Sequence, residues 1–469
     1  MSLSADTQAA IAANRFGLGA RPGDLEAIRS DARGWLRAQL GGTPPQIAGA
    51  DLKPSFATLA EALELRRQIE ERKKSGTLDP AMAEEQQQKL GQFVRPVYVS
   101  EATARFALSV STERTFLERL TQFWTNHFAV SIDKQFMPGV AGAFEREAIR
   151  PNVLGRFADL LLAAESHPAM LMYLDNFVSV GPNSQAAQRL ERRPNAPRLG
   201  INENLAREIL ELHTLGVGGG YTQTDVTTFA QVITGWSIGG NHGRFQGGEP
   251  GRFVFRSELH QPGAKTVLNT RYPDSGYGQG VAVLNDLARH PSTAHFIATK
   301  LCRHFIADEP PAAAVGRLAA AFTASEGDLP TLYRTLVETR EAWAAPLGKF
   351  KTPTDYIYSV YRGLSLPVEA GKGPLGPFDV LGQRTWQPGS PAGWPDRSAD
   401  WDGSSALLKR IEWADQTGAR LGSRIDAKAL GPQLLGENLT DATRTAVSRA
   451  VSAEQAVTLL LAAPEFMRR

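Results

Sequence analysis

The chain is poor in cysteine: Cys302 is the single one among its 469 residues. No intrachain disulfide can form, so a fold stapled by disulfides is excluded. Cys302 follows a helical pattern and lacks the local signature of a reactive thiol. We therefore interpret it as a buried, inert side chain rather than a nucleophile.

Long apolar runs are lacking as well. Runs such as 169–174 and 459–463 fall far short of the ~20 residues that span a bilayer, so no transmembrane helix is predicted. The first residues show no basic segment followed by an apolar run, so we expect no signal peptide and a cytoplasmic protein. Export to the periplasm together with a partner that carries its own signal is the alternative.

The chain has no strong excess of charge of either sign. Lys and Arg number 51 and Asp and Glu number 49, which leaves a net charge of +2. This balance gives no indication of nucleic acid or an anionic membrane as a partner. The composition, 42% hydrophobic and 21% charged, is that of an ordinary globular protein.

The apolar residues that are present recur mostly with helical spacing. Phe116, Leu120 and Phe123 share one face of a helix over 113–130, for example. Strands do not alternate with helices, which argues against a parallel α/β sheet. We predict a mainly α, multi-helix globular array with a small β hairpin near 250–270. Within a single domain, 1–469, we expect a charged helical hairpin arm at about 60–93, a Gly-rich insertion at about 237–278 and a Gly/Pro-rich loop at about 367–397.

Familiar catalytic motifs are missing or stand in the wrong context. There is no His-Glu-x-x-His and no phosphate-binding P-loop. Residues 235–239 match the pattern Gly-x-Ser-x-Gly of a nucleophile elbow. Such an elbow lies between a strand and a helix. Here a predicted helix precedes the pattern and a glycine-rich loop follows it, so the context of a nucleophile elbow is missing. The glycines of 216–220 follow a helix, whereas a dinucleotide fingerprint follows a strand.

The segment 202–215 holds the densest set of chemically active side chains. It is predicted as one helix, capped by Asn202 and ended by Gly216. Acidic and basic residues recur there every four positions, so they share one helix face. The candidate catalytic residues are Glu203, Arg207, Glu208, Glu211 and His213.

Two interpretations of this helix stay open. Its charged face is either a solvent-exposed ladder of ion pairs, worth a few tenths of a kcal/mol per pair, or the wall of a cleft. In a cleft, Arg207 would orient one carboxylate, and another would act as acid, base or metal ligand.

Other polar side chains stand next to aromatic residues. His127 lies on an otherwise apolar helix face, and a satisfied core histidine is the competing interpretation. His167 and Asp175 stand at helix ends, where side chains usually cap. If such imidazoles met the 202–215 helix, they could hold a divalent metal, although the eight histidines are scattered along the chain. The candidate substrate-binding residues are Trp124, Asn126, His127, His167, Asp175, Trp236, His260 and Lys265.

Several motifs resemble those of one known family, and they follow in its order along nearly the whole chain. They are 14–20, 123–128, 167–171, 173–176, 202–226, 234–236, 290–294 and 393–395. The chain is similar to the bacterial domain-of-unknown-function family numbered 1800. The resemblance implies a large, predominantly helical domain and, as a partner, a sulfatase-like exported protein encoded nearby. In one place the chain departs from the family: Gln261 follows His260 where an acidic residue is expected.

Two functions follow as hypotheses. The first is a hydrolase-like enzyme that uses the Glu/Arg/His cluster of the helix at 202–215. The alternative is a non-catalytic binding or maturation partner of the sulfatase-like protein, with the charged arm as its contact surface. The sequence specifies neither a substrate nor a cofactor.

Overall fold

The computed structural model describes residues 3–49, 51–75, 80–134, 136–192, 200–240, 246–368 and 375–469. Segments 76–79, 241–245 and 369–374, which belong to the predicted arm, insertion and loop, lie outside the described residues. The described chain is mainly helical, as predicted, with only two small antiparallel hairpins. No helix in these ranges combines the length and the apolar character that crossing a bilayer requires.

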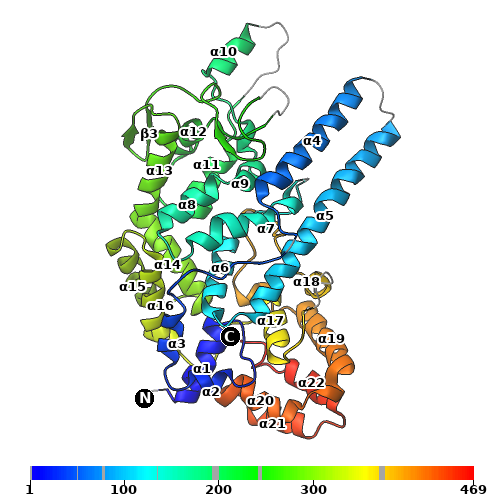
Figure 1. Cartoon of the computed structure of the whole chain (residues 1–469). Coiled ribbons are helices and arrows are strands. Elements are labelled where there is room, and N and C mark those ends of the chain that lie inside the picture. Colours follow the sequence, from blue (N-terminus) through cyan, green and yellow to red (C-terminus); the bar gives the residue numbers. More distant parts are fainter. Residues whose placement is uncertain are drawn as a thin grey trace.

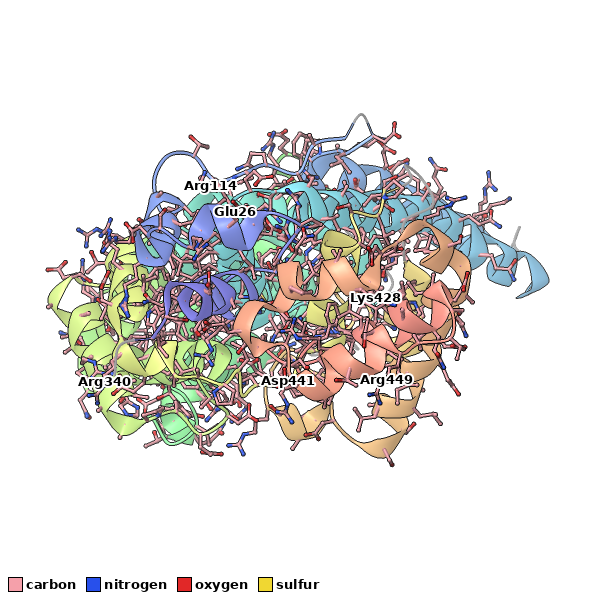
Figure 2. The ribbon with its side chains drawn as sticks, turned by 90° about the horizontal axis from the view of Figure 1, so that it is seen from below. Glu26, Arg114, Arg340, Lys428, Asp441 and Arg449 are labelled. Atoms are coloured by element: carbon pink, nitrogen blue, oxygen red, sulfur yellow. The ribbon has the colours of Figure 1, made fainter. Side chains whose placement is uncertain are left out.

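The two ends of the chain pack against each other at the lower end of the molecule (Figures 1 and 2). The buried Asn14 side chain joins them, because its Nδ2 donates to the Leu434 carbonyl at 3.3 Å. Charged side chains of both signs are spread over this end in Figure 2, so it presents no field of a single sign. The helices here are α1 (Ala5–Ile11), α2 (Asp24–Ile28), α3 (Ala32–Ala38), α20 (Ala427–Leu435), α21 (Asp441–Ser448) and α22 (Ala453–Leu461).

Two long helices, α4 (Ser55–Lys74) and α5 (Pro80–Ser111), lie side by side and project from the body at the upper right of Figure 1. They lie where the charged arm was expected, and they extend further toward the body than 60–93. The inner half of α5 enters the core through buried residues such as Phe106.

The middle of the chain forms the upper part of the body and includes both hairpins. One hairpin pairs β1 (Trp236–Ile238) with β2 (Phe253–Phe255), and the other pairs β3 (Lys265–Val267) with β4 (Thr270–Tyr272). A small hairpin is thus present near 250–270, as expected, and a second one accompanies it. The second hairpin is tight because Leu268 and Asn269 both adopt positive φ, the conformation of a two-residue hairpin turn. The helices here are α7 (Ala141–Phe144), α8 (Phe157–Glu165), α9 (Pro168–Tyr173), α10 (Gln185–Glu191), α11 (Asn204–Glu208) and α12 (Gln223–Val232).

The remaining helices complete the body and place the walls of the site described below. They are α6 (Thr115–His127), α13 (Tyr277–Arg289), α14 (Pro291–Phe305), α15 (Ala312–Ala324), α16 (Leu329–Glu338), α17 (Pro353–Gly363), α18 (Leu375–Leu381) and α19 (Ser404–Leu421). Helix α18 lies inside the segment 367–397, which was expected to be a loop throughout.

An aromatic cluster in the core fixes α6 against α14. The Phe16 ring lies 5.5 Å from Phe116 of α6 and 5.8 Å from Phe305 of α14, and the latter two rings are 5.8 Å apart. All three side chains are fully buried, so each contributes roughly 1.5–3 kcal/mol of transfer free energy. This contact holds the two helices together, and their polar faces meet next to it.

Candidate active site

A cavity of about 350 Å³ lies between α6, α14, the start of α17 and the loop 383–400. This volume is within the range of small-molecule sites. Most of the residues that line it are of charged or polar type. The wall includes Arg105, Arg119, Gln122, Phe123, Asn126, His127, Lys300, Arg303, His304, Asp355, Trp386, Trp394 and Asp396.

Helical periodicity explains which side chains reach the cavity. On α14, Lys300, Arg303 and His304 stand at positions i, i+3 and i+4 and share a face, while Ala298, Cys302 and Phe305 are buried on the other side. On α6 the lining residues recur with the same spacing: Arg119, Gln122, Phe123, Asn126 and His127.

The loop that closes the cavity is pinned to α6. Asn126 donates from Nδ2 to the Trp394 carbonyl at 2.9 Å and accepts from the Trp394 N–H at 2.7 Å. Gly393 makes this approach possible: its φ is +81°, and a Cβ there would lie 2.3 Å from the Asn126 carbonyl oxygen. Further along, the Ile132 N–H donates to the Trp386 carbonyl at 2.9 Å.

A histidine–aspartate pair forms part of the wall. His304 Nδ1 lies 3.0 Å from Asp396 Oδ2, and the imidazole is 15% exposed. Since a carboxylate can only accept, Nδ1 carries the proton and Nε2 is left with a free lone pair. Nε2 is buried and has no hydrogen-bond partner in the described part of the chain.

The charge state of this imidazole follows from its surroundings. Burial lowers the pKa of His304 to about 4, with Asp396 opposing this and the nearby Arg469 and Arg119 reinforcing it. Burial alone would raise the pKa of Asp396, but His304, Lys349 and Arg469 hold it well below its usual range. At neutral pH the pair is therefore a neutral imidazole on a carboxylate, which is the state that a general base requires.

A second aspartate beneath the pair is held by two arginines. Asp355 accepts from Arg119 Nη2 at 2.9 Å and lies 2.8 Å from Arg469 Nε, and all three side chains are buried. Arg469 also reaches within 3.4 Å of Asp396 Oδ1. These pairs fix the position of Asp396 from the side away from His304, and Lys349 donates to its backbone carbonyl at 2.6 Å.

The predicted His127 lines the cavity from the opposite helix. Its Nε2 lies 3.1 Å from the His213 carbonyl oxygen, which can only accept, so Nε2 carries the proton. Nδ1 is buried, without a partner among the described residues. Burial, with Lys300 and His213 in the same direction, holds the pKa of His127 well below its usual value. His213 is itself fully buried, 2.7 Å from Glu165.

The helix predicted over 202–215 is not one continuous α-helix. After α11 it continues as a π-helix over Ile209–Thr214, in which the Leu215 N–H donates to the Leu210 carbonyl five residues back. Glu203 rather than Asn202 is its N-cap residue, although the Asn202 side chain still accepts from the Asn204 N–H at 2.9 Å. The wider π turn rotates the following residues away from the face that four-residue spacing predicts.

The charged ladder is consequently broken after its first pair. Glu203 and Arg207 pair at 3.1 Å on side chains that are 33% and 39% exposed, and Glu211 accepts instead from Tyr221 at 3.1 Å. Burial raises the pKa of the half-buried Glu208. None of these four lines the cavity.

Two of the predicted substrate-binding residues, Asn126 and His127, come together in the cavity. Their neighbour Trp124 belongs to the core, where its Nε1 donates to the Tyr333 hydroxyl at 2.6 Å. His167 caps α9 by accepting from the Ala169 N–H at 3.1 Å.

The others lie in separate places, away from the cavity wall. Asp175 pairs with Lys134 at 2.7 Å, and Trp236 is buried in the core. His260 Nδ1 lies 3.0 Å from the Thr234 carbonyl oxygen. Lys265 donates to the carbonyls of Pro262 and Gly263 at 2.8 and 2.7 Å.

Sequence reasoning missed the histidine–aspartate pair and the residues around it. Lys300, Arg303 and His304 did carry a signal, since three polar residues at i, i+3 and i+4 interrupt an otherwise apolar helix pattern. Asp396 directly follows the Trp394-Pro395 motif. No sequence signal indicates Asp355, because its partners Arg119 and Arg469 are more than a hundred residues away in the sequence.

Among the described residues, no group of three or more His, Cys, Asp and Glu side chains is arranged to hold a metal ion. The family model that matches the chain is DUF1800, described as proteins of unknown function, and it covers residues 11–468. No curated protein and no solved structure matches the chain.

Proposed function

Because the chain belongs to DUF1800, a family whose description assigns no activity, we propose a function from the cavity: a hydrolase-type enzyme with His304 as general base. One observation carries the proposal. His304, a residue of the wall of a cavity of ligand size, has a neutral imidazole oriented by Asp396, and its Nε2 keeps an unshared electron pair with no partner among the described residues. This is the arrangement by which a histidine–carboxylate pair removes a proton from a hydroxyl or a water.

The reaction would run through a water molecule as nucleophile. His304 Nε2 takes a proton from the water, whose oxygen attacks the electrophilic atom of the substrate. The bond to the leaving group then breaks, and the imidazolium returns the proton to that group. Asp396 keeps the required tautomer and stabilises the transient imidazolium. His127, with its lone pair on Nδ1, would accept a hydrogen bond from a substrate hydroxyl or amide.

The test is hydrolysis of a panel of chromogenic esters, comparing wild type with His304→Gln. His295→Gln is the matched control, since His295 is an exposed histidine on the same helix. Loss of a general base lowers kcat by roughly 10²- to 10⁴-fold, and we expect that loss for His304→Gln alone. A full rate for His304→Gln on any ester that the wild type hydrolyses would remove His304 from the mechanism.

A second candidate function concerns the arm. Helices α4 and α5 project from the body (Figure 1), and α4 carries exposed charges such as Arg67, which pairs with Glu64 at 2.7 Å. A projecting charged hairpin supports the role of binding or maturation partner for a sulfatase-like exported protein, the partner that the family resemblance implies. Arg67→Glu should then weaken co-purification of that protein, with Lys409→Glu on α19 as control. Equal recovery with both variants would count against this role.

A further inference from the structure

Two cations in the cavity wall lack a carboxylate partner. The four arginines that line the cavity besides Arg303 each pair with an acid: Arg105 with Glu145, Arg119 with Asp355, Arg384 with Asp379 and Arg397 with Glu309, at 2.7–3.1 Å. Lys300 and Arg303 form no ion pair with any described residue. Lys300 contacts the Phe296 ring, 5.5 Å from its centroid, and Arg303 Nε donates to the Asp308 carbonyl at 3.3 Å.

These two side chains occupy one face of α14, next to the general base. Lys300 and Arg303 are one turn apart, and His304 follows directly, so all three meet the same cavity. Both side chains are half-buried. A charge in such a place has lost part of its hydration, and without a counter-ion it attracts an anion more strongly than the same charge on an open surface.

The ionisable groups behind the wall form no ion pair with Lys300 or Arg303 in the described part of the chain. Lys351 is 1% exposed, and its Nζ has no hydrogen-bond partner among the described residues. The nearby carboxylates Asp355 and Asp396 are shared among Arg119, Arg469 and Lys349. The third carboxylate of the wall, Asp400, is exposed to solvent.

We infer that Lys300 and Arg303 form a subsite for an oxyanion group, a phosphate, sulfate or carboxylate carried by the ligand of this cavity. An ammonium supplies a compact charge, and a guanidinium supplies parallel N–H donors that match the oxygens of such a group. The inference rests on the proposed function, because it names the class of substrate that the proposed enzyme would take. Anion binding to the subsite can nevertheless be measured without any assay of hydrolysis.

The protonation of Lys300 gives the subsite a pH signature. Burial lowers the pKa of Lys300 to about 8, with Asp396 opposing and Arg303 reinforcing the effect. His127, which faces Lys300 from α6, stays neutral. Only the ammonium form attracts the anion, so affinity is expected to fall as the pH rises above about 8.

The experiment is isothermal titration calorimetry of the full chain with sodium phosphate, sodium sulfate and sodium acetate, each at constant ionic strength. Lys300→Met and Arg303→Met keep most of the aliphatic stem, and Lys409→Met, at an exposed lysine, is the matched control. Loss of a charge-assisted contact should weaken Kd roughly tenfold or more in the cavity variants, with no change in the control. Lys300→Arg should retain binding, and melting curves verify that each variant is folded.

The outcomes separate this inference from the catalytic proposal. An anion that binds wild type and His304→Gln equally but not Lys300→Met establishes the subsite, whatever the rate of hydrolysis. Failure of all three anions to bind, or equal binding by Lys300→Met, Arg303→Met and wild type, overturns the subsite even if His304→Gln abolishes hydrolysis. The anion that binds most tightly identifies which oxyanion the ligand carries.

Discussion

Replacing Lys351 by methionine should make the protein more stable. The Lys351 ammonium is buried, has no hydrogen-bond partner among the residues that the structure describes, and lies 4.6 Å from the centroid of the Phe466 ring. Burial lowers its pKa from 10.5 to about 7, with Asp355 opposing and Arg119, Arg469 and Arg410 reinforcing the effect. Each tenfold change in proton affinity is worth about 1.4 kcal/mol, so at pH 7 the lysine costs about 4 kcal/mol relative to the unfolded chain.

The pH dependence of this cost has a definite sign. Between pH 7 and 10.5 the unfolded chain holds the Lys351 proton and the folded chain has released it, so the stability of the wild type rises with pH. The advantage of Lys351→Met should therefore shrink by roughly 1.4 kcal/mol per pH unit between pH 8 and 9. Urea unfolding of both proteins at pH 7, 8 and 9 measures this difference.

Lys349 provides the matched control two residues away. Its Nζ donates to Asp308 at 2.7 Å and to the Asp396 carbonyl at 2.6 Å, and its side chain is equally buried. Lys349→Met removes satisfied hydrogen bonds to a charged group and should cost about 1–3 kcal/mol. If Lys351→Met proves as destabilising as Lys349→Met, or if its advantage does not change with pH, the reasoning about the unpaired ammonium is wrong.

Three further outcomes follow from the site. Asp355→Asn leaves two buried arginines without their carboxylate and should lower the free energy of unfolding by about 3–5 kcal/mol. Asp441→Asn, at an exposed ion pair with an N–O distance of 3.9 Å, should change the free energy of unfolding by less than about 0.5 kcal/mol. Urea titration of the two variants and the wild type measures both values. Gly393→Ala should raise tryptophan fluorescence quenching by acrylamide, because the new Cβ pushes the Trp394 loop off α6; unchanged quenching would contradict the close approach. For any ester that is hydrolysed, kcat/KM should fall below about pH 4 as His304 is protonated, and a limb near pH 6.5 would contradict its burial.

The helical class of the fold could be predicted because periodic apolar residues report local structure directly. The spacing of Thr222 and Asp225 likewise matches a capping box, a pattern visible in the sequence. In the structure each of the two side chains accepts a hydrogen bond from the backbone N–H of the other residue. The pairing of the two hairpins was harder to predict from the sequence. Strand β2 pairs with β1, which ends fourteen residues before it, rather than with β3, the next strand along the chain. Short strands carry little periodicity, so their partners are decided by tertiary packing.

The site was harder to predict, because residue spacing was taken to imply α-helical geometry. Glu203, Arg207 and Glu211 would form a ladder on an α-helix, but the π turn starting at Ile209 removes Glu211 from it. The same π-helix buries His213 and aims its carbonyl at His127, a contact that no spacing rule describes. The cavity itself joins residues near 120, 300, 355 and 396, so His304 could be recognised as part of a site only once α6 and α14 were seen to line the same cavity.

The distribution of charge also indicates which part of the chain is shaped for something other than stability. Buried ion pairs generally contribute less than well-packed apolar residues would, and an unpaired buried cation is unfavourable outright. Elsewhere in the core the chain satisfies its charges, as between Arg150 and the fully buried Glu118 and Glu145. Around the cavity, Lys300, Arg303 and Lys351 form no ion pair with a carboxylate of the described residues. Sequences tolerate such local conflicts mainly at functional sites. The two cations Lys300 and Arg303 and the imidazoles of His127 and His304 belong to the wall of one cavity. A ligand that supplies negative charge and hydrogen-bond donors explains this arrangement best.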